Sequence, residues 1–145
     1  MEILFVAGFA PITPDPAAAA QFYRGDLGLP FEKVMGDYLA VDGFPGAKHL
    51  GLWPLRDAAM SCFGTEYWPE DVPVPQATID FEVADVGASA DELVAKGYRL
   101  IHDTKTEPWG QVIARLLGPE GLLIGLCYTP WLHETTDENP DVRGG

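Results

Sequence analysis

The chain has 145 residues, a length that allows one ordinary domain, and 47% of them are hydrophobic, which excludes wholesale disorder. Nine Lys+Arg against 22 Asp+Glu give a formal net charge of −13. Nucleic acid and anionic membrane surfaces repel such a chain, so we expect neither as a partner.

The first half of the chain predicts a strand, a helix and three short strands. The apolar run ILFVAGFA at residues 3–10 predicts a buried strand that Pro11 ends. Asp15 and Pro16 suit the N-cap and the first position of a helix that continues to Gly28. Three short strands, separated by Gly and Pro, are expected at residues 31–35, 37–41 and 48–53.

An irregular stretch follows, and then the same order returns. Residues 55–75 hold a short helix and a proline-rich segment, and we interpret them as a connector held in place by Tyr67 and Trp68. In QATIDFEV, apolar and polar residues alternate, which predicts a half-buried strand. Asp85 then begins a helix that Gly97 ends. Three further strands are expected at residues 98–102, 111–117 and 122–128.

The order strand, helix, three strands therefore occurs twice, with a period of roughly 70 residues that indicates internal duplication. This predicts an α+β fold made of two tandem βαβββ modules, residues 1–54 and 76–130, within one domain spanning 1–133. Residues 134–145 are polar and acidic, and we expect a flexible tail there.

The cysteines and the N-terminal segment bear on location. Cys62 and Cys127 are too few for the disulfide framework of a small secreted domain, and we expect both to be buried small hydrophobes. The segment MEILFVAGFAPITPDP lacks a basic stretch followed by a long apolar run, so it does not read as a signal peptide. No apolar run reaches the roughly 20 residues of a membrane span. We therefore expect a cytoplasmic protein.

Three segments, FYRGDLGLPFE, ATIDFEVADV and WGQVIARLLGPEGLLIGL, together with the duplicated order, resemble the vicinal oxygen chelate superfamily. Glyoxalases, extradiol dioxygenases, fosfomycin-inactivating enzymes and bleomycin-resistance proteins belong to that superfamily. The resemblance covers residues 3–130. It implies a cupped mixed sheet whose concave face holds a small-molecule ligand, often with a divalent metal, and it implies a homodimer.

The resemblance also implies where a metal would be held. Members that bind metal place four ligands, usually His, Glu and Gln, on the first and last strands of each module. Those places fall here on Gly8, Gly51, Thr78 and Gly125. Glycine offers no side-chain donor and a neutral threonine is a poor one. We therefore expect no metal and no other cofactor, as in the bleomycin-resistance-like branch.

Strand alternation, counted from those four places, predicts which side chains line the concave face. The three glycines among them are expected to widen its floor, so that a flat ligand can approach the backbone. The side chains that we predict to contact a ligand are His49, Trp53, Asp80, Glu82, Trp109, Gln111 and Arg115.

Each of these residues has more than one interpretation. Trp53 and Trp109 suit stacking on a planar ligand, or filling of the core or a dimer interface. His49 could act as a general base or a lone metal ligand, or it could be a polar wall residue or a partly exposed strand end. The pair Asp80 and Glu82 could bind a cation or transfer a proton, or it could form a structural salt bridge with Arg115 or simply face solvent.

Two further possibilities concern the histidines. His49, Asp80 and Glu82 together could build a displaced metal site of imidazole and carboxylates. His102 and His133 lie beside acidic and polar residues, and we expect both at the surface.

Three functions follow as hypotheses. The first is a non-enzymatic protein that sequesters an aromatic or cationic compound, as antibiotic-resistance proteins of this superfamily do. The second is a metal-independent lyase or isomerase that uses His49, or Asp80 and Glu82, as acid–base groups. The third is a metal-dependent lyase or dioxygenase, against which the four ligand places argue. No catalytic residue is assigned from the sequence.

Overall fold

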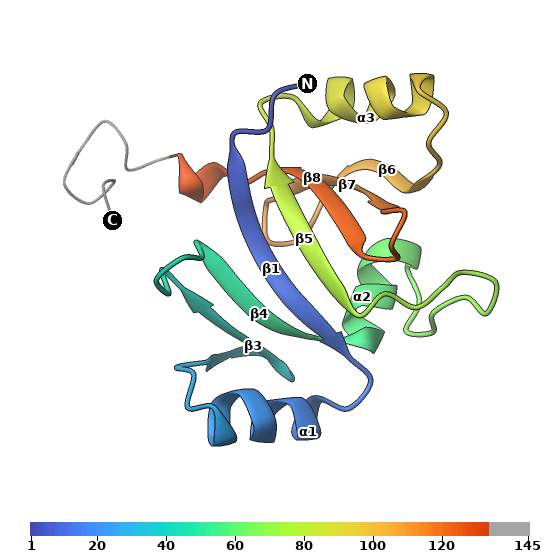
Figure 1. Cartoon of the computed structure of the whole chain (residues 1–145). Coiled ribbons are helices and arrows are strands. Elements are labelled where there is room, and N and C mark those ends of the chain that lie inside the picture. Colours follow the sequence, from blue (N-terminus) through green and yellow to red (C-terminus); the bar gives the residue numbers. More distant parts are fainter. Residues whose placement is uncertain (134–145) are drawn as a thin grey trace.

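The computed structural model of the chain describes residues 1–133, so the predicted acidic tail at 134–145 lies outside the described residues (Figure 1). The first half contains every predicted element, and its helix starts with Pro16 after the Asp15 side chain accepts the Ala18 N–H. Its elements are β1 (Phe5–Thr13), α1 (Pro16–Ala20), the π-helix η1 (Gln21–Asp26), β2 (Glu32–Met35), β3 (Tyr38–Asp42) and β4 (His49–Pro54).

The second half repeats the pattern after an additional helix. Asp85 caps α3 by accepting the Ala88 N–H, as its position predicts. The elements are α2 (Leu55–Phe63), β5 (Ala77–Glu82), α3 (Val86–Ala95), β6 (Leu100–Thr106), β7 (Val112–Leu117), β8 (Leu123–Tyr128) and the 3₁₀ turn η2 (Pro130–Leu132).

Two predicted strand boundaries are wrong. Strand β1 does not end at Pro11 but continues to Thr13. Proline has no N–H, but none is required at this position, because the next residue, Ile12, donates its N–H to the Gln76 carbonyl at 2.8 Å. Strand β6 continues to Thr106, well past the predicted end at residue 102, because its second half pairs with β7.

The connector was predicted correctly for one of its two aromatic residues. Trp68 packs against the cluster around α2 and donates its indole N–H to the Val72 carbonyl at 3.0 Å. Tyr67 is 79% exposed and does not hold the segment in place, which corrects the prediction. The division into modules at residues 54 and 76 stays a prediction.

All eight strands form one mixed sheet in the order β2-β3-β4-β1-β5-β8-β7-β6. The two modules meet at the antiparallel pair β1–β5, and each of these strands is flanked by the last strand of its own module in parallel. The α+β fold with two βαβββ modules is therefore confirmed.

The helices cover the two faces of the sheet differently. In Figure 1, α1 lies below the β3–β4 half of the sheet and α3 above the β8–β7–β6 half. Both pack on what we call the outer face, α1 near Leu39 and Leu52, and α3 against Ala114 and Leu126. Helix α2 packs on the opposite, concave face, where Cys62 meets Leu123. No helix among residues 1–133 is long and apolar enough to span a membrane.

Candidate functional site

One row of paired residues crosses the concave face of the sheet. The strand register aligns Gly8 of β1 with Asp80 of β5, Asp80 with Gly125 of β8, and Gly125 with Arg115 of β7. Arg115 is in turn paired with His102 of β6. A carboxylate, a guanidinium and an imidazole thus lie in line, with a glycine on each side of the carboxylate.

The Asp80 side chain lies over Gly125. A Cβ added to Gly125 would collide with the Asp80 carboxylate, so the carboxylate occupies the space that any other residue would fill at that place. Thr78 lies on the same strand face and donates its hydroxyl to the Leu123 carbonyl at 3.1 Å. Burial raises the pKa of Asp80, and the nearby Arg115 opposes that rise.

Gly51 has a similar neighbour. A Cβ at Gly51 would lie 2.6 Å from the Tyr38 hydroxyl, so this glycine makes room for a tyrosine of the adjacent strand. The prediction that the glycines clear a floor for a flat ligand is therefore wrong at Gly51 and Gly125, because side chains of the chain itself fill both places. Only at Gly8 is the space ordinary, with the nearest atoms, those of His49, at 3.5 Å.

The four positions that hold a metal in this superfamily do not fit a metal here. Two of the four are occupied by Tyr38 and Asp80, and Gly8 has no donor atom on a side chain. Thr78 already uses its hydroxyl within the sheet. The described residues contain no group of three His, Cys, Asp or Glu side chains placed to hold a metal ion.

A hydrogen-bonded chain of three side chains, Tyr38, His49 and Asp42, runs along the edge of the concave face. His49 Nε2 lies 2.5 Å from the Tyr38 hydroxyl, and His49 Nδ1 lies 2.6 Å from Asp42 Oδ1. In the neutral ring, Nδ1–H donates to Asp42 and Nε2 accepts from Tyr38. Burial and the charges of Asp80 and Asp42 raise the pKa of Tyr38, so the phenol stays protonated at neutral pH.

A second cluster surrounds Arg115, which is only 2% exposed. Its Nη1 donates to Ser61 Oγ at 2.8 Å and to His102 Nε2 at 3.1 Å, and forms an ion pair with Glu107 at 3.8 Å. Glu107, also buried, accepts from Ser61 at 2.7 Å and pairs with Lys105 at 3.2 Å. Helix α2, strand β6 and the β6–β7 turn are thereby tied to strand β7.

This cluster fixes the protonation state of His102. Nδ1 lies 2.7 Å from the Asp103 carbonyl, which can only accept, and Nε2 faces Arg115, which can only donate. His102 is therefore neutral with its proton on Nδ1, and burial lowers its pKa. The expectation that His102 is a surface residue is wrong: it is half-buried, because the pairing of β6 with β7 sets it opposite Arg115.

Glu82 belongs to a third cluster at the far end of β5, and it is fully buried. It accepts from the Thr129 N–H at 2.6 Å and contacts the Cys127 thiol at 3.4 Å. His133 Nε2 lies 2.7 Å from the same carboxylate, and the His133 ring stacks on Tyr128. His133 is therefore half-buried, which corrects its predicted surface position.

Asp80 and Glu82 consequently do not work as a pair. They lie on the same strand face, but Glu82 is bound to Thr129 and His133, while Asp80 faces Arg115. The predicted salt bridge from this pair to Arg115 is not what forms, because Glu107 takes that role. The displaced metal site of His49, Asp80 and Glu82 is not assembled among the described residues.

Trp53 and Trp109 are not brought together. Trp53 packs near Leu123 at the start of β8, with Arg115 above its ring at 5.4 Å. Trp109 is 51% exposed and lies just before β7, whose first residue Val112 pairs with Tyr128 at the end of β8. The two tryptophans therefore lie near different ends of β8, whose first and last residues are about 17 Å apart along the strand. Stacking of one planar ligand on both rings is thus disfavoured.

Gln111 belongs with Trp109. It accepts the Trp109 indole N–H at 3.1 Å and donates to the Thr129 hydroxyl at 3.0 Å. Of the seven residues predicted to contact a ligand, His49, Trp53, Asp80 and Arg115 thus lie around the central row, whereas Glu82, Gln111 and Trp109 form the separate cluster at the end of the sheet.

The sequence reasoning missed four residues of the site, which come from places without a motif. Ser61 and Glu107 fall in the predicted connector helix and in a predicted loop, Tyr38 falls in the predicted strand 37–41, and Asp42 comes just after that strand. Alternation on 37–41 places Tyr38 on the same face as Gly51 once the β3–β4 pairing is known, and that was the available signal.

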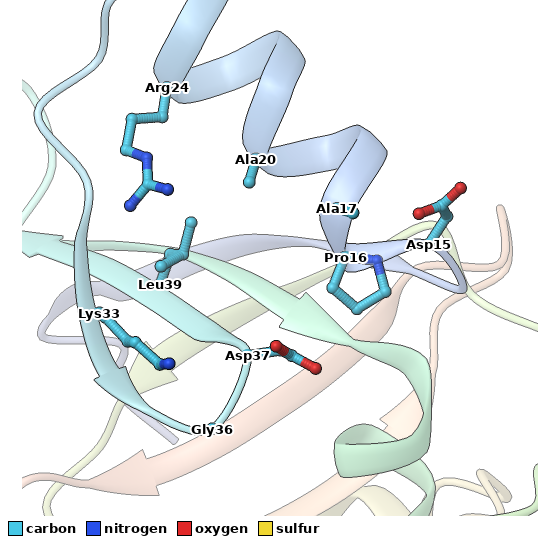
Figure 2. A pocket seen from close by; sticks show the side chains of 9 residues that line it. All are labelled: Asp15, Pro16, Ala17, Ala20, Arg24, Lys33, Gly36, Asp37 and Leu39. Carbon is cyan, nitrogen blue, oxygen red and sulfur yellow. The ribbon is translucent and has the colours of Figure 1, made fainter.

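A cavity of about 330 Å³ lies on the outer face, away from these clusters. Figure 2 shows it between the first helix and the β2–β3 hairpin, with Arg24 reaching down from η1 and Lys33 extending from β2. Asp37, on the turn of the hairpin, is paired with Arg56. None of the predicted ligand-contact residues lines this cavity.

Comparisons with known proteins agree with this architecture. The model of the Glyoxalase/Bleomycin resistance protein/Dioxygenase superfamily matches residues 9–126. No curated protein matches the sequence.

Two solved structures are similar in fold. A variant of Streptomyces coelicolor methylmalonyl-CoA epimerase in complex with 2-nitronate-propionyl-CoA has 22% identity and a TM-score of 0.55, over 88% of this chain and 96% of that chain. A superfamily member from Vibrio splendidus has 17% identity and a TM-score of 0.53, over 86% of this chain and 98% of that chain. At these identities the likeness shows the fold alone.

Proposed function

Because the chain belongs to the glyoxalase/bleomycin resistance protein/dioxygenase superfamily, we propose that it is a small-molecule-binding protein that works without the metal of that superfamily. Its ligand lies on the concave face, against the row formed by Asp80, Gly125 and Arg115. The observation that carries the proposal is the position of Asp80: a partly buried carboxylate occupies a metal-ligand place, next to a buried guanidinium.

Two arguments support this proposal. Charged groups are seldom buried on a sheet face unless they are paired or serve recognition, since removing them from water is costly. The concave face carries two such groups in one row, Asp80 and Arg115, with the neutral His102 next to Arg115. In addition, His49 and Tyr38 stay partly exposed there and can exchange hydrogen bonds with a polar ligand.

A cationic ligand is disfavoured. A cationic compound was expected to use Asp80 and Glu82 together, but Glu82 is fully buried and already bound. Asp80 faces a permanent cation, which disfavours a second one beside it. An aromatic body remains compatible with Trp53, whose ring lies beside the row.

The test is a binding screen read by amide NMR. A panel of planar fragments of different charge is added to the protein, and a ligand on the concave face is expected to move the amide signals of Gly8, Gly51 and Gly125. The variant Asp80→Asn should change the affinity for such a ligand, while Asp91→Asn, at an exposed aspartate of α3, should not. Hits that move only signals of the outer face would contradict the proposal.

A second candidate is an acid–base enzyme of the same fold, favoured by the Asp42–His49–Tyr38 chain. The Tyr38 oxygen can take a proton from a bound molecule while the phenol proton passes to Nε2 of the neutral His49, whose Nδ1–H Asp42 orients, and the reverse transfer returns the proton. A methylmalonyl-CoA epimerase shares the fold, though at 22% identity. The test is deuterium uptake by a bound fragment in D₂O, which the variant His49→Gln should abolish and Asp91→Asn should not.

We also propose a homodimer. The edge strand β2 is exposed along its length, with Val34 61% and Met35 78% exposed. Exposed apolar side chains on an unpaired strand edge favour association with another chain.

A further inference from the structure

Among residues 1–133, Arg115 uses one of its three nitrogens, Nη1, for polar contacts. Nη1 holds Ser61, His102 and Glu107, and these contacts fix the guanidinium against β7. Trp53 covers one flat side of the group. The guanidinium is thus held in a single orientation by its neighbours, as a preorganised recognition group is.

The opposite edge of the guanidinium has no acceptor in residues 1–133. Nε is buried and unpartnered, the one buried side-chain nitrogen or oxygen of the described residues in that condition, and Nη2 makes no hydrogen bond there either. Nε–H and Nη2–H point in parallel along that edge, the arrangement that accepts the two oxygens of a planar carboxylate. A buried charged donor without an acceptor calls for an explanation, and a ligand oxygen supplies one.

The charges around Arg115 also favour an anion. Arg115 and Lys105 are balanced by the single carboxylate of Glu107, which leaves one positive charge in this cluster. Asp80 is the next acid along the row, and burial raises its pKa while Arg115 itself opposes that rise. A local positive charge in a chain with a net charge of −13 is a specific feature rather than a general one.

We infer that the ligand of the concave face carries a carboxylate, which binds the Nε–Nη2 edge of Arg115 through two parallel hydrogen bonds. This inference rests on the proposed function, because it assumes that the ligand lies on the concave face. It adds the chemical class of the group that is recognised and the atoms that recognise it.

The experiment reads the Arg115 Nε–H directly by ¹H–¹⁵N NMR, in the whole protein. The signal is assigned by its loss in the variant Arg115→Lys. Matched probes are titrated: benzoate against benzamide, and indole-3-acetate against indole-3-acetamide, with inorganic phosphate as a separate arm. We expect each acid to shift the Nε–H signal and to bind about tenfold to a hundredfold more tightly than its amide.

Two variants test the same preference for acid over amide. Arg115→Lys keeps the positive charge but loses the parallel pair of donors, so the preference of wild-type protein for acid over amide should fall by about tenfold. Arg99→Gln removes an exposed arginine and should leave the preference unchanged. Should Arg115→Lys fail to fold, the Nε–H signal is assigned through its scalar couplings along the Arg115 side chain to the backbone, and the acid-against-amide comparison on wild-type protein decides the question.

The outcomes separate the two proposals. If amides and acids bind equally and move the Gly8, Gly51 and Gly125 signals without moving Nε–H, the carboxylate inference is overturned and the proposed function stands. A shift of Nε–H by phosphate alone would also overturn the carboxylate class. If no probe of any charge moves the signals of the concave face, both proposals are contradicted.

Discussion

The sharpest prediction concerns Glu107, the buried carboxylate that balances Arg115. The change Glu107→Gln keeps an acceptor for the Ser61 hydroxyl but removes the negative charge. Arg115, 2% exposed, is then left as a buried cation whose remaining partners are neutral. Removing one partner of a buried ion pair typically costs about 3–5 kcal/mol of unfolding free energy. We expect about 3 kcal/mol, the low end, because the pair is 3.8 Å long.

A double-mutant cycle checks the cause. Urea unfolding is measured at one fixed protein concentration for wild type, Glu107→Gln, Arg115→Met and the double variant. The double variant has no unbalanced buried charge of this pair. Its loss of unfolding free energy should therefore be smaller than the sum of the two single losses, by about 1–3 kcal/mol. The control Glu70→Gln, an exposed glutamate, should change the unfolding free energy by less than about 0.5 kcal/mol. A loss below about 1 kcal/mol for Glu107→Gln, with additive singles, would refute the reasoning.

Four further predictions follow from the site and the fold. Gly125→Ala should destabilise the protein by about 1–3 kcal/mol through collision with Asp80, whereas Gly8→Ala, whose added Cβ meets nothing nearer than 3.5 Å, should change the urea midpoint little. Burial lowers the pKa of His102, so the stability that this residue contributes is full above about pH 6.5 and is lost as the pH falls through its pKa in the folded protein. His102→Gln should therefore flatten the fall in unfolding free energy between about pH 7 and pH 5. An unchanged pH profile would contradict this. Light scattering at high micromolar concentration should give about twice the 15.7 kDa of one chain, and a monomer mass would count against the homodimer. Protein purified without added metal should hold no stoichiometric transition metal by elemental analysis, since the four superfamily positions are filled or lack donors; about one Zn, Mn, Fe or Ni per chain, removable by a chelator, would show the opposite.

The sequence predicted the fold well because local signals determine it. Alternation in 76–83, the N-caps Asp15 and Asp85, and the Gly and Pro punctuation each act within a few residues, and all appear in the structure. The two errors in strand length arise where pairing overrides a local signal. Pro11 stops a strand only if its missing N–H is needed, and residues 103–106 read as a loop only until their pairing with β7 is known.

The site was predictable in part for the same reason. Alternation, counted from the metal-ligand places that the superfamily resemblance implies, placed His49, Asp80 and Arg115 on one face. The partners were not predictable, since they depend on which segments meet in space. The carboxylate that pairs with Arg115 is Glu107, 46 residues from Ser61, and not the predicted Asp80. A local pattern of residue types does not indicate this pairing.

The present side chains and the superfamily metal site exclude one another at Gly125. The carboxylate of Asp80 fills the space of any side chain at that place, so a metal-ligating residue at 125 would have to displace Asp80 from its position beside Arg115. Likewise, a ligand residue at 51 would need the space of the Tyr38 hydroxyl, and with it the hydrogen bond from Tyr38 to His49. The glycines are therefore more than lost ligands: they are what allows Asp80 and Tyr38 to lie on the concave face. A function that depends on Asp80, Arg115 and Tyr38 requires glycine at both places, and this couples the absence of the metal ligands to the polar row that stands where they would be.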